Sequence, residues 1–416
     1  MKTIWKKITA ALGVAILAGT VLSAQPCQDI RQLYGVYYIQ DFTPYAIPPA
    51  PRGYTAVGIS HYGRHGARYQ DSEEAYTRIL ETLSEARSAG NLTSLGESVL
   101  SRVDSLYSIC RFHHGELTPL GWEQHRGIAH SLVRAYPGLF KANAEVTATS
   151  SFSQRCMMSM QAFCLGLKEA RPGLHLYAET SRTLLDQTNP GDKQNIRYEN
   201  AEVLPSPWGL SYEDHLKRVV SESMADSILL RLFKDKEALR PLSPVGWCQA
   251  LYNLISGMGC TGPDLRIEDV FTEEELRCFY RAINYGFFQW GALSRNRHKP
   301  ALKRMAEMAE EDLKAGHPVI RLRFGHDTIL LGILHLLQAG TLGIIPDSVE
   351  DLADTWNCYM TPMAAHFELV FYRSRRDARV LVLPLLNGSP IRLSALQEKG
   401  GGFYDWDSLR DYIRGL

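Results

Sequence analysis

The sequence predicts an α/β protein whose sheet carries a mainly helical insertion in the second half of the chain. In three places a short apolar run rich in strand-forming residues is followed by a polar loop and a stretch with helical spacing. Between residues 200 and 294, strand signals are few and helical patterns are broken by Pro and Gly. Strands that alternate with helices form sheets whose ligands gather at the carboxyl ends of the strands.

The composition is that of a folded protein without a global charge field. Of the 416 residues, 45% are hydrophobic and 22% charged, close to the averages for soluble domains. Lys+Arg and Asp+Glu both number 45, so the basic surface that non-specific nucleic-acid binders need is absent. We expect no nucleic-acid partner, and any anionic ligand must be held by a local cluster.

The first 24 residues have the layout of a secretory signal peptide. Three lysines precede the apolar run from Ile8 to Leu22, and the small residues Ser23 and Ala24 follow. The run is shorter than the ~20 residues that span a bilayer. We therefore expect cleavage after residue 24 and an exported, periplasmic or secreted protein without stable membrane insertion. A buried N-terminal helix is the alternative.

Eight cysteines follow this segment, and an exported chain can oxidise them. Cys156 and Cys164 fall on one predicted helix about 12 Å apart, too far for a mutual disulfide. Cys248 with Cys260 is the pair that we expect first. The sequence has no CxxC motif, which argues against a zinc ribbon or a thioredoxin-type site.

The three strand–loop–helix segments supply the predicted sheet, although the sequence has no internal repeat. The first has a strand at 54–60, a loop at 61–70 and a helix from about 71. The second has a strand at 146–149, a loop at 150–153 and a helix at 154–167. The third has a strand at 319–324, a loop at 325–327 and a helix at 328–338. Asp71, with Glu74 three residues later, predicts a capping box at the start of the first helix.

Further elements complete the predicted division of the chain. Thr118 and Pro119 mark another helix start, and residues 365–373 and 379–386 have the pattern of late strands. The predicted α/β domain comprises residues 25–199 and 295–416. The predicted helical cap comprises residues 200–294.

The loop after the first strand carries Arg64-His65-Gly66-Ala67-Arg68. Arginine presents planar paired donors that match phosphate oxygens, and a neutral imidazole nitrogen can attack phosphorus to give a phosphohistidine. Gly63 and Gly66 are expected to let the backbone approach a ligand closely. A solvated loop with two arginines and a histidine is the alternative for this cluster alone.

The other two units carry charged residues at the same topological place. Arg155 stands among apolar and small residues at a helix start, where an unpaired charge facing the core is costly, so it needs an anion or a buried partner. His326 can donate to a phosphate oxygen, and Asp327 can protonate a leaving oxygen. A surface-facing arginine and an ordinary aspartate helix cap are the alternatives.

Together these segments contain a nucleophile, cationic groups and an acid, as phosphoryl transfer requires. Arg64-His65-Gly66-x-Arg68, the later Arg155 and the distant His326-Asp327 resemble the histidine acid phosphatases, a branch of the histidine phosphatase superfamily that includes phytases and multiple inositol polyphosphate phosphatases. The segment Leu117-Thr-Pro-Leu-Gly is also similar to one in this family. The resemblance implies a phosphoglycerate-mutase-like sheet domain with helices on both faces and a helical cap.

The resemblance also implies a role for each residue. His65 is the expected nucleophile, and Arg64, Arg68 and Arg155 are the expected phosphate clamp. His326 would donate to phosphate, while Asp327 would act as general acid and then activate water. No metal or cofactor is expected, since the arginines meet the phosphate charge. For Asp327 to donate, its pKa must be lifted by burial and by phosphate, which favours an acidic working pH.

Two departures from the family pattern bear on the substrate. Acid phosphatases usually continue as Arg-x-Pro, whereas Tyr69 and Gln70 follow Arg68 here, and the Arg-Tyr pair is more similar to the inositol polyphosphate branch. That branch commonly carries His-Ala-Glu, whereas His326-Asp327 is similar to phytases. Phytate or another inositol polyphosphate is the leading expected substrate, with sugar phosphates and unspecific phosphomonoesters as alternatives.

Other chemistries fit the sequence less well. A metal site at His61 and His65 would need a helix that the intervening glycine disfavours, and no HExxH motif occurs. A serine nucleophile at Ser60 lacks the glycine its elbow needs, because Tyr62 stands there. A phosphate-binding protein without turnover and a phosphomutase remain as alternatives, although export favours hydrolysis. The sequence leaves the oligomeric state open.

Overall fold

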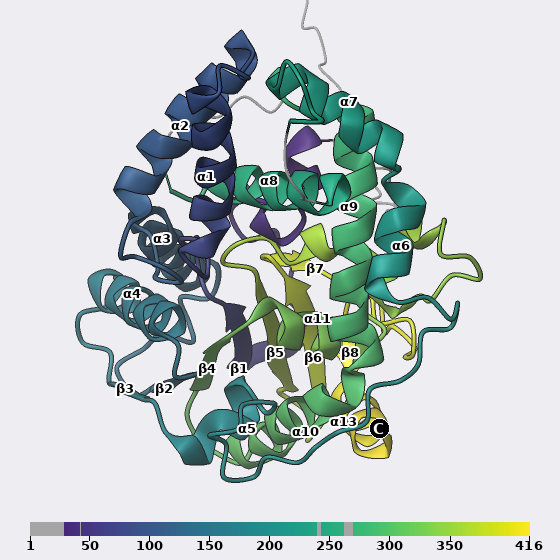
Figure 1. Ribbon diagram of the computed structural model, residues 1–416. Helices are drawn as coiled ribbons and strands as arrows, with labels where there is room; N and C mark the ends of the chain where they lie inside the picture. Colours follow the sequence, from purple (N-terminus) through teal and green to yellow (C-terminus); the bar gives the residue numbers. More distant parts are fainter. Residues whose placement is uncertain (1–28, 42, 239–242, 262–268) are drawn as a thin grey trace, which may run out of the picture.

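A computed structural model describes residues 29–41, 43–238, 243–261 and 269–416. The predicted signal peptide and Cys27 lie outside these ranges. Within them, a mixed eight-stranded sheet has the order β3-β2-β4-β1-β5-β6-β7, and β8 pairs with β6 (Figure 1). The strands are β1 (Tyr54–Arg64), β2 (Glu145–Ser150), β3 (Leu176–Glu179), β4 (Val319–Gly325), β5 (His366–Ser374), β6 (Val380–Leu386), β7 (Ser389–Pro390) and β8 (Tyr404–Asp405).

The central strands align the three sequence units. β4 runs parallel to both β1 and β2, with Arg64 opposite Gly325 and Ser150 opposite Phe324. β1 therefore ends level with β4 and β2, and the loops that follow these strands leave the same edge of the sheet. The late strands β5 and β6 return antiparallel beside β1, as predicted.

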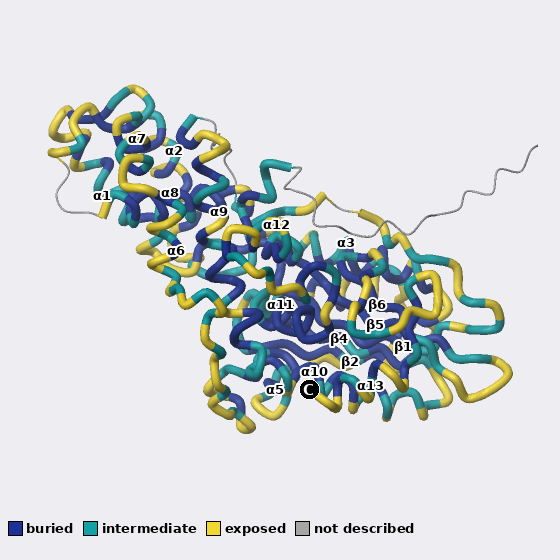
Figure 2. Tube along the Cα trace, turned by 90° about the vertical axis from the view of Figure 1, so that its right-hand side faces the viewer, coloured by how far each residue is buried: buried dark blue, intermediate teal, exposed yellow. Residues whose placement is uncertain are grey.

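Helices cover both faces of the sheet, as the predicted fold class requires. Ile59, Val146 and Leu322 project into a core shared with α3 (Pro119–Ala135) and α4 (Gln154–Ala170). Tyr62 and Phe367 join a second core with α10 (Arg295–Asp312) and α11 (Asp327–Leu336). Figure 2 shows that the central strands of the sheet are mostly buried.

The end of the molecule away from α10 and α13 is helical (Figure 1). It combines α1 (Glu74–Ser88) and α2 (Ser94–Cys110) with α6 (Tyr212–Val219), α7 (Glu222–Leu232), α8 (Pro244–Met258) and α9 (Glu273–Phe288). The Thr93 N–H donates to Leu232 O at 3.0 Å, joining the two chain segments. This helical end thus includes residues from both halves of the sequence; the division into domains at residues 200 and 294 stays a prediction.

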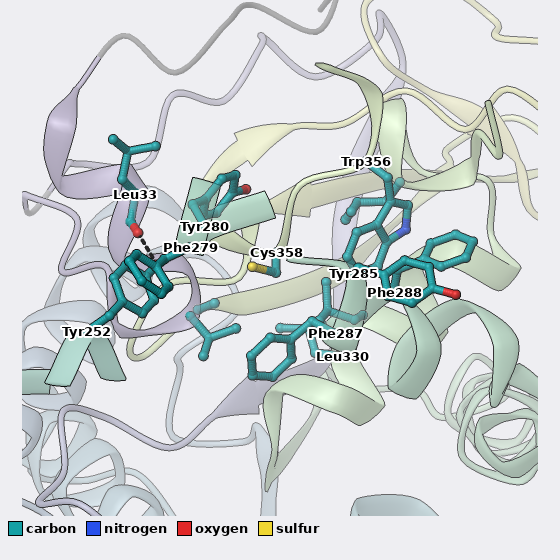
Figure 3. Close-up of a cluster of buried hydrophobic side chains, with 14 of the residues drawn as sticks. Leu33, Tyr252, Phe279, Tyr280, Tyr285, Phe287, Phe288, Leu330, Trp356 and Cys358 are labelled. Carbon is teal, nitrogen blue, oxygen red and sulfur yellow. Dashed lines mark hydrogen bonds between the residues drawn. The ribbon is translucent and has the colours of Figure 1, made fainter. Parts of the chain in front are cut away.

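A shared aromatic core connects the helical end to the sheet. Figure 3 shows Tyr252 and Phe279 side by side near Leu33, and Phe288 beside Trp356 with Leu330 of α11 close by; all belong to one core. The remaining helices and short helical turns are α5 (Leu185–Thr188), α12 (Leu352–Thr355), α13 (Trp406–Gly415), η1 (Ile30–Tyr37), η2 (Arg182–Leu184), η4 (Gln289–Leu293), η5 (Gly340–Gly343) and η6 (Cys358–Met360). None of the helices in the described ranges has the length and apolar character needed to cross a bilayer.

Several local predictions are confirmed and others are wrong. Thr118 caps α3 by accepting the Gly121 N–H at 3.2 Å, with Pro119 in the first turn, as predicted. The first loop is shorter than predicted, because β1 pairs on both sides as far as Gly63 and with β4 as far as Arg64.

The predicted capping box at Asp71 is wrong. Helix α1 has Glu73 at its N-cap position without a side-chain cap bond, and Asp71 pairs with Arg68 instead. The predicted Cys248–Cys260 disulfide is also wrong, because both thiols are free. Cys248 belongs to the large helical core, whereas Cys260 packs with Ala67 and Met363.

Candidate active site

The loops after β1, β2 and β4 converge and bring the predicted site residues together. The His65 N–H donates to Gly325 O at 3.0 Å, and the Ser151 N–H donates to Phe324 O at 3.0 Å. These backbone bonds fix the first residue of the β1 loop and the first residue of the β2 loop against the end of β4. Residues distant in sequence therefore share one site.

Arg64 is fully buried at the end of β1 and is held on several sides. Its Nη1 donates to Val36 O at 2.5 Å and to Thr361 O at 2.8 Å. Its Nη2 lies 2.8 Å from Asp327 Oδ2 as an ion pair. Its buried Nε has no hydrogen-bond partner, which leaves one donor for an anion.

His65 has the protonation state that a nucleophile needs. Only 2% of the residue is exposed, and Nδ1 lies 2.9 Å from Gly66 O. Because a carbonyl oxygen only accepts hydrogen bonds, Nδ1 carries the proton and Nε2 keeps its lone pair. Burial, followed by the charges of Arg64 and Arg155, lowers the pKa of His65 well below 6.5. The imidazole is therefore neutral in the free protein.

Arg68, in the loop after β1, and Arg155, in the first turn of α4, face the same region. Arg68 donates to Tyr69 O at 2.8 Å and to the Tyr37 hydroxyl at 3.3 Å, and its guanidinium lies 5.2 Å from the centre of the Tyr37 ring. Arg155 donates to Gly115 O at 3.3 Å. The buried Nε atoms of Arg68 and Arg155, like that of Arg64, have no hydrogen-bond partner.

A buried donor without a hydrogen-bond partner costs free energy unless a ligand accepts its hydrogen bond. Three guanidinium groups whose Nε donors are unpartnered in one place fit a tetrahedral oxyanion, and arginine pairs readily with phosphate. The alternative of a solvated loop does not hold for Arg64, His65 and Arg68, which are all buried.

His326 lies beside the nucleophile, with ring centroids of His326 and His65 5.8 Å apart. Its Nε2 is 3.1 Å from Ser151 Oγ and 3.8 Å from Cys156 Sγ, so Nδ1 is the nitrogen left for a ligand. Burial alone would lower the pKa of His326, but the Cys156 thiol raises it. In turn, burial would raise the pKa of Cys156, but His326 lowers it to about 7.

Ser151 and Cys156 are site residues that sequence reasoning missed. Ser151 directly follows β2, just as His65 directly follows β1 and His326 directly follows β4. This shared position at the end of a strand is the sequence signal for Ser151. No pattern in the sequence marks Cys156, because its contact with His326 depends on the orientation of α4.

Asp327 is the first residue of α11 and does not cap the helix, since His326 occupies the N-cap position. Its Oδ1 accepts the Thr328 N–H at 2.7 Å, and its Oδ2 pairs with Arg64. Burial raises the pKa of Asp327, but Arg64, His326 and Arg68 outweigh burial and lower it below 3.8. In the free protein burial alone therefore does not lift the pKa of Asp327, because the partner cations favour the carboxylate; a lift with phosphate bound stays a prediction.

The glycines of the first motif serve protein packing. A Cβ at Gly66 would lie 2.5 Å from Gly121 O in α3, and a Cβ at Gly63 would lie 2.7 Å from Cε1 of His61. The space beside these two glycines is occupied by α3 and by a neighbouring side chain, and this packing positions the His65 loop. Close approach of a ligand to their backbone stays a prediction.

A cavity of about 390 Å³ is lined by residues that include Tyr45, Gln124 and His366. None of the predicted site residues lines it, so the chemistry of the side chains, rather than cavity size, locates the site. Across the described ranges, no three His, Cys, Asp or Glu side chains form a group suited to a metal ion.

Comparisons with known proteins agree with this geometry. The family model of the histidine phosphatase superfamily (branch 2) matches residues 63–383, more than half of the chain. A comparison with curated protein sequences finds no match.

Solved structures share the fold at low sequence identity. The apo form of Bifidobacterium longum multiple inositol polyphosphate phosphatase has a TM-score of 0.71 and 17% identity, covering 92% of this chain and 97% of that chain. Its complex with inositol hexasulfate has a TM-score of 0.67 and 18% identity, with the same coverage. A phytase from D. castellii has a TM-score of 0.68 and 16% identity, covering 93% and 85%. With its converging motif residues and the matched family model, this chain belongs to branch 2 of the histidine phosphatase superfamily.

Proposed function

We propose that this protein is an exported, metal-independent phosphomonoesterase that acts through a phosphohistidine on His65. One observation supports this more than any other. The neutral His65 keeps its Nε2 lone pair beside Arg64, Arg68 and Arg155, each with an unpartnered buried Nε donor. A nucleophile surrounded by fixed cations suits attack on a phosphate monoester, whose charge the cations neutralise.

The proposed reaction has two steps. In the first, a bond forms between His65 Nε2 and phosphorus, the ester P–O bond breaks, and Asp327 gives its proton to the leaving alcohol oxygen. In the second, a water oxygen bonds to phosphorus, Asp327 takes the water proton, and the N–P bond breaks to return neutral His65. The products are an alcohol and inorganic phosphate.

The ionisation of Asp327 sets the proposed pH dependence. In the free protein, nearby cations keep this carboxyl ionised. A bound phosphoryl group would neutralise part of the charge of Arg64 and Arg68 and add negative charge, and both effects raise the pKa of Asp327. The proton donor would then be populated at acidic pH when substrate is bound.

Metal independence is proposed on charge grounds. Three guanidinium groups surround the site, and they can stabilise the equatorial oxygens in the way that a divalent ion does in other phosphoryl-transfer sites. Export is proposed from the signal-peptide pattern of residues 1–24.

Inositol polyphosphates are the proposed substrates. Structural relatives include a multiple inositol polyphosphate phosphatase complexed with inositol hexasulfate and a phytase, which supports a polyanionic inositol ester here. A broad-specificity acid phosphatase or sugar phosphatase is the second candidate, because the phosphate-facing residues described above do not depend on the alcohol.

Hydrolysis of p-nitrophenyl phosphate at about pH 4 to 6, with and without a chelator, tests the proposal. We expect activity that a chelator leaves unchanged, little activity in His65→Ala, and full activity in the control His130→Ala, whose side chain pairs with Glu169 on the surface. Chelator-sensitive turnover would contradict metal independence. Phosphate binding without turnover would identify a binding protein, and a panel of esters would separate phytate from sugar phosphates.

A further inference from the structure

Asp71 brings a negative charge to the arginines of the site. Its Oδ2 accepts from Arg68 Nη2 at 2.8 Å, and its Oδ1 lies 3.9 Å from Arg155 Nη2. The side chain is 58% exposed and lies at the outer side of the cluster. Arg68 and Arg155 therefore already face the Asp71 carboxylate in the free protein, as Arg64 faces that of Asp327.

The backbone before Asp71 is firmly held. The Gln70 N–H donates to the Tyr76 hydroxyl at 3.1 Å, and Gln70 Nε2 donates to Asn253 O at 2.9 Å. The Tyr37 hydroxyl donates to Gln70 Oε1 at 2.7 Å. These bonds fix the chain between η1, α1 and α8, so the position of Asp71 is set by the fold.

Asp71 and Arg155 face each other over Gly115. A Cβ at Gly115 would lie 3.4 Å from Arg155 Nη1 and 3.8 Å from Asp71 Oδ1. Gly115 also has a φ of +71° and is tied to Gln70 O through its N–H at 2.8 Å. The positive φ favours glycine at this position, and a Cβ there would be in ordinary contact with both side chains.

The Asp71 carboxylate has no evident structural task. It does not cap α1, and within the described ranges its polar contacts are with Arg68 and Arg155. Arg68 is independently held by Tyr69 O and the Tyr37 hydroxyl. Loss of the carboxylate would therefore leave Arg68 in place.

We propose that Asp71 is an internal competitor of phosphate for Arg68 and Arg155, and that it weakens the retention of inorganic phosphate after hydrolysis. This inference rests on the proposed function. A phosphate that approaches these arginines must either displace the carboxylate or bind beside a like charge, and both cost binding free energy. The weaker retention speeds product release and lowers product inhibition.

The size of the effect follows from the exposure of Asp71. Solvent screens a half-exposed charge, so removal of one nearby like charge strengthens phosphate binding roughly five-fold rather than by orders of magnitude. Asp71→Asn keeps the shape of the side chain and removes only the charge, which makes it the appropriate variant.

The test measures the dissociation constant of inorganic phosphate by calorimetry for the wild type, Asp71→Asn and the control Glu74→Gln. Glu74 lies exposed in the first turn of α1 and its substitution makes the same change in net charge. We expect Asp71→Asn to bind phosphate roughly five-fold tighter and to show equally stronger product inhibition. Glu74→Gln should stay within about two-fold of the wild type, because in the described ranges Glu74 forms no ion pair with Arg68 or Arg155 and solvent and salt screen its exposed charge.

The outcomes separate this inference from the proposed function. Unchanged or weaker phosphate binding in Asp71→Asn, with a wild type that binds phosphate and hydrolyses esters, would overturn the inference and leave the proposed function intact. Weaker binding in particular would mean that Asp71 organises Arg68. If no variant binds phosphate, the proposed function fails and this inference fails with it.

Discussion

The substitution Asp327→Asn tests the proposed acid in depth. The asparagine keeps the size of the side chain but has no proton to give to a leaving oxygen. General acid catalysis contributes roughly 10²- to 10⁴-fold, so hydrolysis of an alkyl phosphate should fall by that factor. Hydrolysis of p-nitrophenyl phosphate should fall far less, because its phenolate leaves with little protonation.

The structure also predicts the cost of this change in stability. Asp327 pairs at 2.8 Å with Arg64, whose side chain is 0% exposed, while 14% of the Asp327 side chain is exposed. Breaking a buried ion pair costs about 3–5 kcal/mol when one charge is left without a partner. Arg64 keeps the carbonyls of Val36 and Thr361, so we expect the free energy of unfolding to fall by about 2 kcal/mol, below that range.

The assay compares kcat/KM for glycerol 2-phosphate and for p-nitrophenyl phosphate at a temperature where the variant is folded. Asp312→Asn is the control, since Asp312 at the end of α10 forms an ion pair with Arg321 of β4 and its side chain is 15% exposed, close to the 14% of Asp327. It should lose stability and keep both activities. Equal losses on the two substrates in Asp327→Asn would refute the assignment of Asp327 as the acid.

Three further predictions concern the clamp, the motif loop and pH. Arg155→Ala should weaken inhibition by inorganic phosphate roughly 10- to 100-fold in steady-state assays; unchanged inhibition would remove Arg155 from the site. Gly66→Ala places a Cβ 2.5 Å from Gly121 O and should cost about 1–3 kcal/mol in denaturant unfolding. Gly138→Ala, which meets nothing within 4 Å, should cost little, and equal losses would contradict the contact. Burial lowers the pKa of His125 from 6.5 to about 3, so the unfolded chain binds a proton that the folded chain does not. As the pH falls from about 6 to about 3, each pH unit should lower the free energy of unfolding by about 1.4 kcal/mol through His125. Curves of stability against pH that stay parallel for the wild type and His125→Gln would refute this.

The sequence predicted which residues meet because the relevant signals are local and the topology is simple. Arg64, His65 and His326 each follow a β-rich run, and parallel strands end at one edge of a sheet. The chemistry of each residue type then limited the possible reactions. Arg155 was predicted in the same way from its place after β2.

The sequence could not predict the contacts that tune the site. Asp71 satisfies a local capping pattern, yet its carboxylate pairs with Arg68. The same aspartate in the sequence is compatible with a helix cap and with an ion pair, so the sequence does not distinguish them. The lowered pKa of Asp327 depends on the position of Arg64, which the strand register sets. Spacing likewise could not show that Cys248 and Cys260 belong to different cores.

The most direct test of the account is to trap the covalent intermediate. Protein mixed with p-nitrophenyl phosphate is quenched under denaturing alkaline conditions, in which phosphohistidine survives, and its peptides are analysed by mass spectrometry. We expect a phosphoryl group on His65, none at that peptide in His65→Ala, and a larger trapped fraction in Asp327→Asn, which lacks the base for the second step. Turnover with His65 unmodified, or a phosphoryl group on another residue, would contradict the account.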